Sequence, residues 1–96
     1  MAGPPPNTIT FAIWGPIARA DLPGLCDRVC ALITTSGAGT ALCDVAGIAV
    51  DAVTVDALAR LQLAAHRQNC RIRLLGASDQ LRELVEFMGL DDVLAL

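Results

Sequence analysis

The chain has 96 residues, of which 54% are hydrophobic and only 3% aromatic, so we expect a single domain with a core of Ala, Leu, Val and Ile. The net charge is −3 and all seven basic residues are Arg, scattered without a basic stripe, which argues against nucleic acid as a partner. No apolar run approaches the roughly 20 residues needed to span a membrane, and the N-terminus does not resemble an export signal. We therefore expect a cytoplasmic protein without membrane insertion.

A tail and a strand are expected first. Residues 1–7 begin with MAGPPP, whose prolines exclude helix and central strand, so we expect a flexible N-terminal tail before a domain over residues 8–96. Small polar residues and Ala alternate with large apolar residues over 8–14, which predicts a strand with one buried face. Trp14, at the end of this strand, is expected in the core.

A helix and a second strand follow. Asp21 precedes a Leu-Pro pair, which predicts a helix N-cap with proline in the first turn. Apolar residues then recur at three- and four-residue spacing up to a Ser-Gly-rich loop at 34–39. The run 41–45 predicts a short strand that is apolar enough to be covered on both faces, as parallel strands usually are.

The second helix is expected to begin around the turn at 51–56. Its buried side is expected to consist of Val55, Leu58, Leu61, Leu63 and Ala65. Its solvent side is expected to consist of Arg60, Gln62, His66 and Arg67. Asn69 should end the helix, because Asn tolerates the left-handed conformation at a C-cap.

The C-terminal part predicts a third strand and a third helix. Residues 71–75 alternate so that Arg71 and Arg73 share one face of a strand. Ser78 and the residue after it should cap a helix that ends at Gly89, while the last six residues are compatible with a short strand or a packed tail. The order of elements predicts an α/β fold, with a mainly parallel or mixed sheet and about three helices.

Three carboxylates lie in or near the turn between the second strand and the second helix. Asp44, Asp51 and Asp56 are compatible with a metal or acid–base site, but no His, Lys or Glu accompanies them in the nearby sequence. Asp51 is better interpreted as an acceptor for the free N–H groups of the second helix. Thr54 is the only hydroxyl in the turn; we favour a helix N-cap over a phosphoacceptor for it.

Histidine and cysteine do not predict a metal site or a cofactor. His66 is the only histidine and is expected to be a solvated surface residue. The four cysteines, Cys26, Cys30, Cys43 and Cys70, lie among apolar neighbours without a C-x-x-C spacing, so we favour buried reduced thiols over a disulfide or a metal role. No catalytic set emerges, and residue chemistry alone predicts a small interaction domain without enzyme activity.

The order of three stretches is more specific than any single motif. They read DVAGIAVDAVT, VDALARLQLAAHRQNCRIRLLGAS and DQLRELVEFMGLDDVL. From about residue 44 onward the chain thereby resembles the STAS domain, the fold of bacterial anti-sigma factor antagonists and related partner-switching proteins. The family's turn reads approximately Asp-Ser-Ser-Gly-Leu, so that Asp51 falls on its Asp, Ala52 on its phosphorylated Ser, Val53 on the next Ser and Thr54 on its Gly.

The resemblance implies a binding protein that regulates transcription. Its partner would be an anti-sigma factor or a serine-kinase-like regulatory protein, bound through the turn and the second helix at Asp51, Ala52, Val53, Thr54, Val55 and Leu58. A homodimer is also left open. In the family, phosphorylation of the turn serine ends the contact, but Ala52 has no hydroxyl, so this chain should behave as a permanently unphosphorylated form. Thr54 as a displaced phosphoacceptor is the weaker reading.

Two alternatives to this function remain open. Some short STAS proteins are subunits docked on the ATPase of a lipid-transport ABC complex, and this chain resembles them in size. A third, less favoured alternative is an enzyme that uses Asp51 or Asp44.

Overall fold

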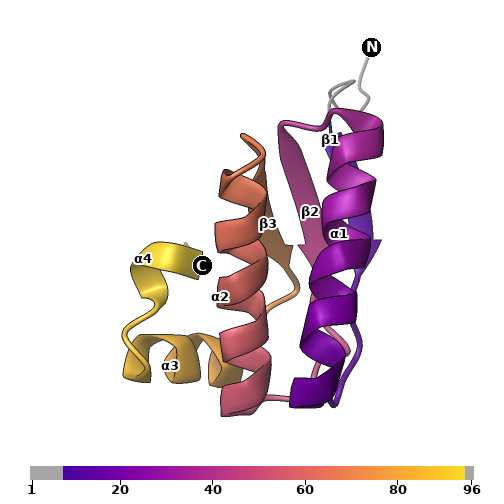
Figure 1. The fold of residues 1–96 in the computed structure, drawn as a ribbon. Coiled ribbons are helices and arrows are strands. Elements are labelled where there is room, and N and C mark those ends of the chain that lie inside the picture. The colour runs from indigo at the N-terminus through magenta and orange to yellow at the C-terminus, as the bar shows by residue number, and fades with distance from the viewer. Residues whose placement is uncertain (1–7, 95–96) are drawn as a thin grey trace.

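A computed structural model describes residues 8–94 of the chain (Figure 1). The tail predicted at 1–7 and the final residues 95–96 lie outside the described residues. The elements follow the order β1 (Thr8–Ala12), a 3₁₀ turn η1 (Arg19–Asp21), α1 (Leu22–Ser36), β2 (Thr40–Asp44), α2 (Ala52–His66), β3 (Arg71–Leu75), α3 (Asp79–Phe87) and α4 (Asp91–Leu94). The predicted α/β fold is confirmed. No helix in this described part of the chain has the length and apolar character to cross a membrane.

The three strands form a parallel sheet in the order β1-β2-β3. Ile9 pairs with Ala41, and Ala41 pairs with Ile72, so side chains in the same row point to the same face of the sheet. In Figure 1, α1 and α2 both lie in front of the sheet, while α3 and α4 lie beside α2. α1 connects β1 to β2, and α2 connects β2 to β3. Because both connections are right-handed and move across the sheet in the same direction, both helices lie on the same face.

Only this helix-covered face of the sheet is fully buried. Ala41 and Cys43 are both 0% exposed beneath the helices. On the opposite face, Leu42 is half-buried and Asp44 is exposed. The expectation that residues 41–45 would be covered on both faces was therefore wrong: among the described residues, no helix covers the second face of the sheet.

The core joins the sheet to α2 and to the C-terminal helices. Its largest fully buried side chains include Leu58, Leu61, Leu81 and Leu94. The predicted faces of α2 need two corrections: Gln62 is buried at 2% exposure, whereas Leu63 is 53% exposed. Residues 91–94 form the short helix α4, with Leu94 2% exposed, in place of the strand or packed tail that the sequence left open there.

The helix-end signals agree with the sequence analysis except at Asp21, which precedes α1 as predicted but caps no N–H of that helix; its carboxylate accepts from the Ala18 N–H at 3.3 Å. The Ser78 hydroxyl accepts a hydrogen bond from the Leu81 N–H at 3.1 Å, which caps α3. Gly89 has φ 73° just beyond α3, and Asn69 has φ 58° after α2. Both residues tolerate the left-handed conformation that turns the chain at a helix C-terminus.

Candidate functional site

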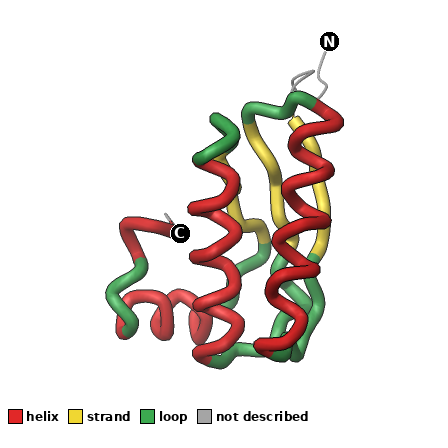
Figure 2. Tube along the Cα trace, in the orientation of Figure 1, coloured by secondary structure: helices red, strands yellow, loops and turns green. Residues whose placement is uncertain are grey.

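The loops that follow the three strands lie at one end of the molecule. Because the strands are parallel, their carboxyl ends share one edge of the sheet, where α/β proteins place most of their functional residues. Figure 2 shows these loops in green near the N-terminal ends of α1 and α2. The turn that enters α2 belongs to this group, and it contains the residues singled out in the sequence.

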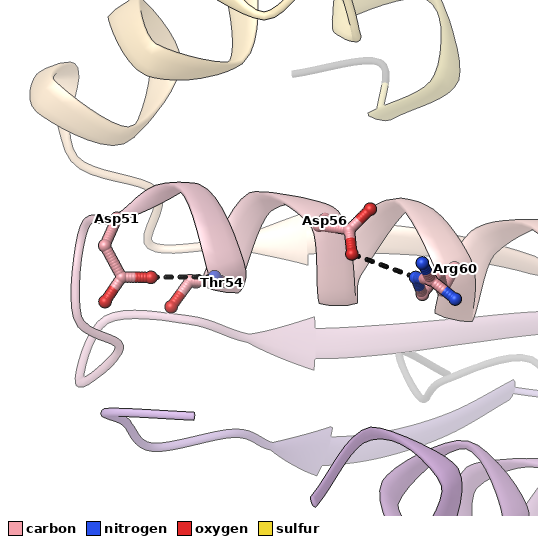
Figure 3. A network of polar contacts seen from close by, with 4 residues as sticks. All are labelled: Asp51, Thr54, Asp56 and Arg60. Carbon is pink, nitrogen blue, oxygen red and sulfur yellow. Dashed lines mark hydrogen bonds and ion pairs between the residues drawn. The ribbon is translucent and has the colours of Figure 1, made fainter. Parts of the chain in front are cut away.

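Asp51 caps the first turn of α2 (Figure 3). Its backbone is extended, with φ −149° and ψ 170°, and its Oδ1 accepts a hydrogen bond from the Thr54 N–H at 2.8 Å. A carboxylate at this position satisfies one free N–H and interacts favourably with the helix dipole. The predicted capping role of Asp51 is therefore confirmed.

Thr54 is not the N-cap that the sequence favoured. It lies inside the first turn of α2, where its backbone N–H is the group that Asp51 caps. Its side chain is 0% exposed, and its hydroxyl has no hydrogen-bond partner among the described residues. A kinase would reach this hydroxyl only if the start of α2 opened.

The three carboxylates of the turn region, on Asp44, Asp51 and Asp56, each interact with a different group. Asp44 Oδ1 accepts a hydrogen bond from the Ala46 N–H at 2.9 Å and shapes the start of the loop. Asp56 pairs with Arg60 Nε at 2.9 Å, four residues along α2 and on its outer surface (Figure 3). Within residues 8–94, no group of three or more His, Cys, Asp or Glu side chains is arranged to hold a metal ion. His66 lies exposed at the end of α2.

Exposure divides the six predicted contact residues into two sets. Ala52 is exposed, and Asp51 and Val53 are partly exposed, so these three can meet a partner. Thr54 and Val55 are 0% exposed and Leu58 is 2% exposed, because they form the core-facing side of α2. The expectation of direct contact through Thr54, Val55 and Leu58 is corrected: their side chains hold α2 on the sheet.

Two exposed apolar side chains close to the turn were not predicted. Trp14 is 78% exposed, which corrects the expectation that it lies in the core, and Val50 is 39% exposed. The alternation of the strand was the available signal, because a period of two places Trp14 on the face of Thr10 and Ala12, opposite the buried Ile13. The exposed surface of the turn is consequently more apolar than its aspartates suggested.

The cysteines lie outside the turn, and three of them, Cys26, Cys43 and Cys70, have raised pKa values. Burial raises the pKa of the Cys43 thiol to about 12, with a further contribution from the neighbouring Asp44 carboxylate. Burial also raises the pKa of the Cys26 and Cys70 thiols. Cys43 and Cys70 are buried as predicted, but Cys26 and Cys30 are partly exposed on α1. A high thiol pKa disfavours the reactive thiolate.

Comparison with known proteins identifies the family. A family model described as "Mlab, STAS domain" matches residues 5–95. The chain belongs to the STAS domain family. Domains of this family are in general regulatory or binding domains, and the three-stranded α/β fold with α2 entered through an Asp-capped turn agrees with membership. A search of curated proteins found no match.

Proposed function

We propose that this STAS domain is a non-enzymatic, cytoplasmic regulatory protein that binds an anti-sigma factor or a related kinase-like partner through the turn at 51–53. The single observation that carries the proposal is the exposed position of Ala52, the first residue of α2, where the family's phosphoacceptor serine is expected. Its neighbours Asp51 and Val53 are also accessible. The three residues form a small continuous contact surface at the end of the helix.

The chemistry of this surface supports binding rather than catalysis. Asp51 is engaged in the helix cap, and Ala52 and Val53 offer no nucleophile or proton-transfer group. In the family's switch, a phosphate would add about −1.5 to −2 charges to the interface. Because Ala52 lacks a hydroxyl, the contact cannot be ended in this way, and the amount of either protein would control it.

The test is a pull-down from native lysate with the wild-type chain and the variant Ala52→Glu, followed by titration of the purified partner. We expect the wild type to recover a kinase-like regulatory protein and Ala52→Glu to weaken binding at least tenfold. The variant should remain folded, because an acidic residue in the first turn of a helix is favourable. Ala31→Glu, at an exposed alanine on α1, is the matched control and should bind normally.

A gain-of-function variant examines the same surface from the other direction. Ala52→Ser restores a hydroxyl at an exposed position, so a kinase partner should phosphorylate it and then release it. Radiolabel from ATP should appear in Ala52→Ser and not in the wild type. If Ala52→Glu binds as tightly as the wild type, the turn is not the contact surface and the proposal fails.

A second candidate is a small STAS subunit docked on the ATPase of a lipid-transport ABC complex. The observation behind this candidate is that the matched family description, "Mlab, STAS domain", names no anti-sigma factor. Recovery of an ATP-binding-cassette protein in the pull-down, in place of a kinase-like protein, would establish this function. The contact residues at the turn would serve either partner.

A further inference from the structure

Trp14 is a large apolar side chain that the fold leaves almost entirely in water. It is the only tryptophan of the chain and is 78% exposed, although the preceding Ile13 is buried at 5%. Trp14 therefore contributes little to the core. An exposed tryptophan is among the side chains that most often dominate the energy of a protein interface.

The position of the indole is nevertheless set by the backbone beneath it. The Gly15 N–H donates to the Gly47 carbonyl at 3.3 Å, which joins the loop after β1 to the loop after β2. A Cβ added at Gly47 would lie 3.2 Å from Trp14 Cδ1, so the absence of a side chain there makes room for the ring. The indole thus has one edge against Gly47 while most of its surface faces solvent.

The loop beneath Trp14 is apolar and has carboxylates at both ends. Residues 45–50 read VAGIAV, between Asp44 and Asp51. Elsewhere, Trp14 lines a small pocket together with Asp21 and Arg28. Asp44 and Asp51 each use Oδ1 to accept a backbone N–H, and among the described residues Oδ2 of each accepts no hydrogen bond. The loop beside Trp14 is therefore apolar, and each aspartate at its two ends keeps one carboxylate oxygen free.

We propose that Trp14 is the anchor of the partner interface, inserted into an apolar recess of a protein whose rim carries Arg or Lys side chains. This inference rests on the proposed function and specifies the partner surface that it requires. Basic side chains at the rim would donate to the free oxygens of Asp44 and Asp51, while the recess removes the indole from water. The loop at 45–50 would lie against the same partner.

Binding measurements with the purified partner from the pull-down test the anchor. Trp14→Ala should weaken binding about 30-fold or more, with an unchanged circular dichroism spectrum because the side chain lies outside the core. Phe87→Ala is the matched control, since Phe87 is an aromatic side chain with 88% exposure on α3. It should change affinity less than threefold. Asp44→Asn should reduce the salt dependence of association.

A spectroscopic readout follows Trp14 directly. Fluorotryptophan incorporated into this chain gives a single fluorine NMR signal, which should shift when the partner is added. An unshifted signal, with Trp14→Ala binding as the wild type while Ala52→Glu is impaired, would overturn the anchor and leave the proposed function standing. A shift caused by anionic phospholipid vesicles, and not by the partner, would also overturn it. If no partner is recovered, both proposals fail.

Discussion

The side-chain amide of Gln62 forms hydrogen bonds with both the N–H and the carbonyl of Ile72. Gln62 Nε2 donates to the Ile72 carbonyl at 2.8 Å, and Gln62 Oε1 accepts from the Ile72 N–H at 2.8 Å. β3 pairs with β2 on one side only, so its other edge has no neighbouring strand, and α2 is the helix that packs against β3. Gln62 therefore provides, at this one residue, the pairing that a neighbouring strand would provide.

Removal of this amide should be costly for the fold. In Gln62→Ala, the buried N–H and carbonyl of Ile72 would both lose their partner, and each unsatisfied group costs about 1 to 3 kcal/mol. We expect the free energy of unfolding to fall by about 2 to 4 kcal/mol, measured by urea denaturation.

Gln68→Ala is the matched control for this prediction. Gln68 Oε1 accepts a hydrogen bond from the Thr34 hydroxyl at 2.7 Å, but this contact is exposed to water. Its loss should therefore cost less than about 1 kcal/mol. Equal effects of the two substitutions would show that the pairing with Ile72 does not stabilise the sheet edge.

The same contact explains which part of the fold could be predicted from the sequence. The order of strands and helices, the caps at Asp51 and Ser78, and the turn at Gly89 depend on residues close together in the chain. Gln62 is buried because it lies against β3. The pattern of apolar residues in α2 gives no information about where β3 lies. A glutamine beside arginine and histidine on a helix reads as a solvent-facing residue unless the location of the strand edge is known.

In the candidate site, too, contacts between residues close in sequence were predictable and contacts between distant segments were not. The cap at Asp51 was predictable because its acceptor role involves an N–H only three residues away. The exposed position of Trp14 was not, because it depends on contact between the loops after β1 and β2. The burial of Val55 and Leu58 was predicted from their helical spacing, yet the family resemblance placed the same residues in the interface. Packing of α2 on the sheet excludes that second role.

The Asp51 cap gives a second prediction. Asp51→Ala removes the acceptor for the Thr54 N–H and should lower the free energy of unfolding by about 1 kcal/mol. Asp51→Asn keeps an oxygen acceptor and should retain most of this stability, since Asn is an equally good N-cap. Thermal and urea unfolding of the two variants measure the difference. Identical losses in both would mean that the carboxylate charge, and not the cap geometry, is important.

The hydroxyl of Thr54 gives a third prediction. It is buried without a hydrogen-bond partner in the described structure, and such a group costs about 1 to 3 kcal/mol relative to a satisfied one. Thr54→Val keeps the branched shape and removes the polar atom, so it should raise stability by about 1 kcal/mol. Thr54→Ser, which keeps the hydroxyl and loses a buried methyl, should lower it. A destabilised Thr54→Val would show that the hydroxyl is satisfied in solution.

The cysteines predict a loss of stability in alkaline solution. The folded pKa of Cys43 is raised to about 12 from the ordinary value of 9.0 because the thiol is buried. Between these values the unfolded chain releases the proton and the folded chain retains it, so stability is fully present below pH 9.0 and falls as the pH rises towards about 12. The slope from one such thiol reaches about 1.4 kcal/mol per pH unit.

This chain suits the measurement because few other groups titrate in the same range. It contains no Tyr and no Lys, the two side chains that ordinarily titrate near pH 10. Cys26 and Cys70, whose pKa values are also raised by burial, should add to the slope. Cys43→Ala should therefore make the decline between pH 9 and about 12 shallower. An unchanged decline in that variant would show that Cys43 ionises as readily in the folded protein as in the unfolded chain.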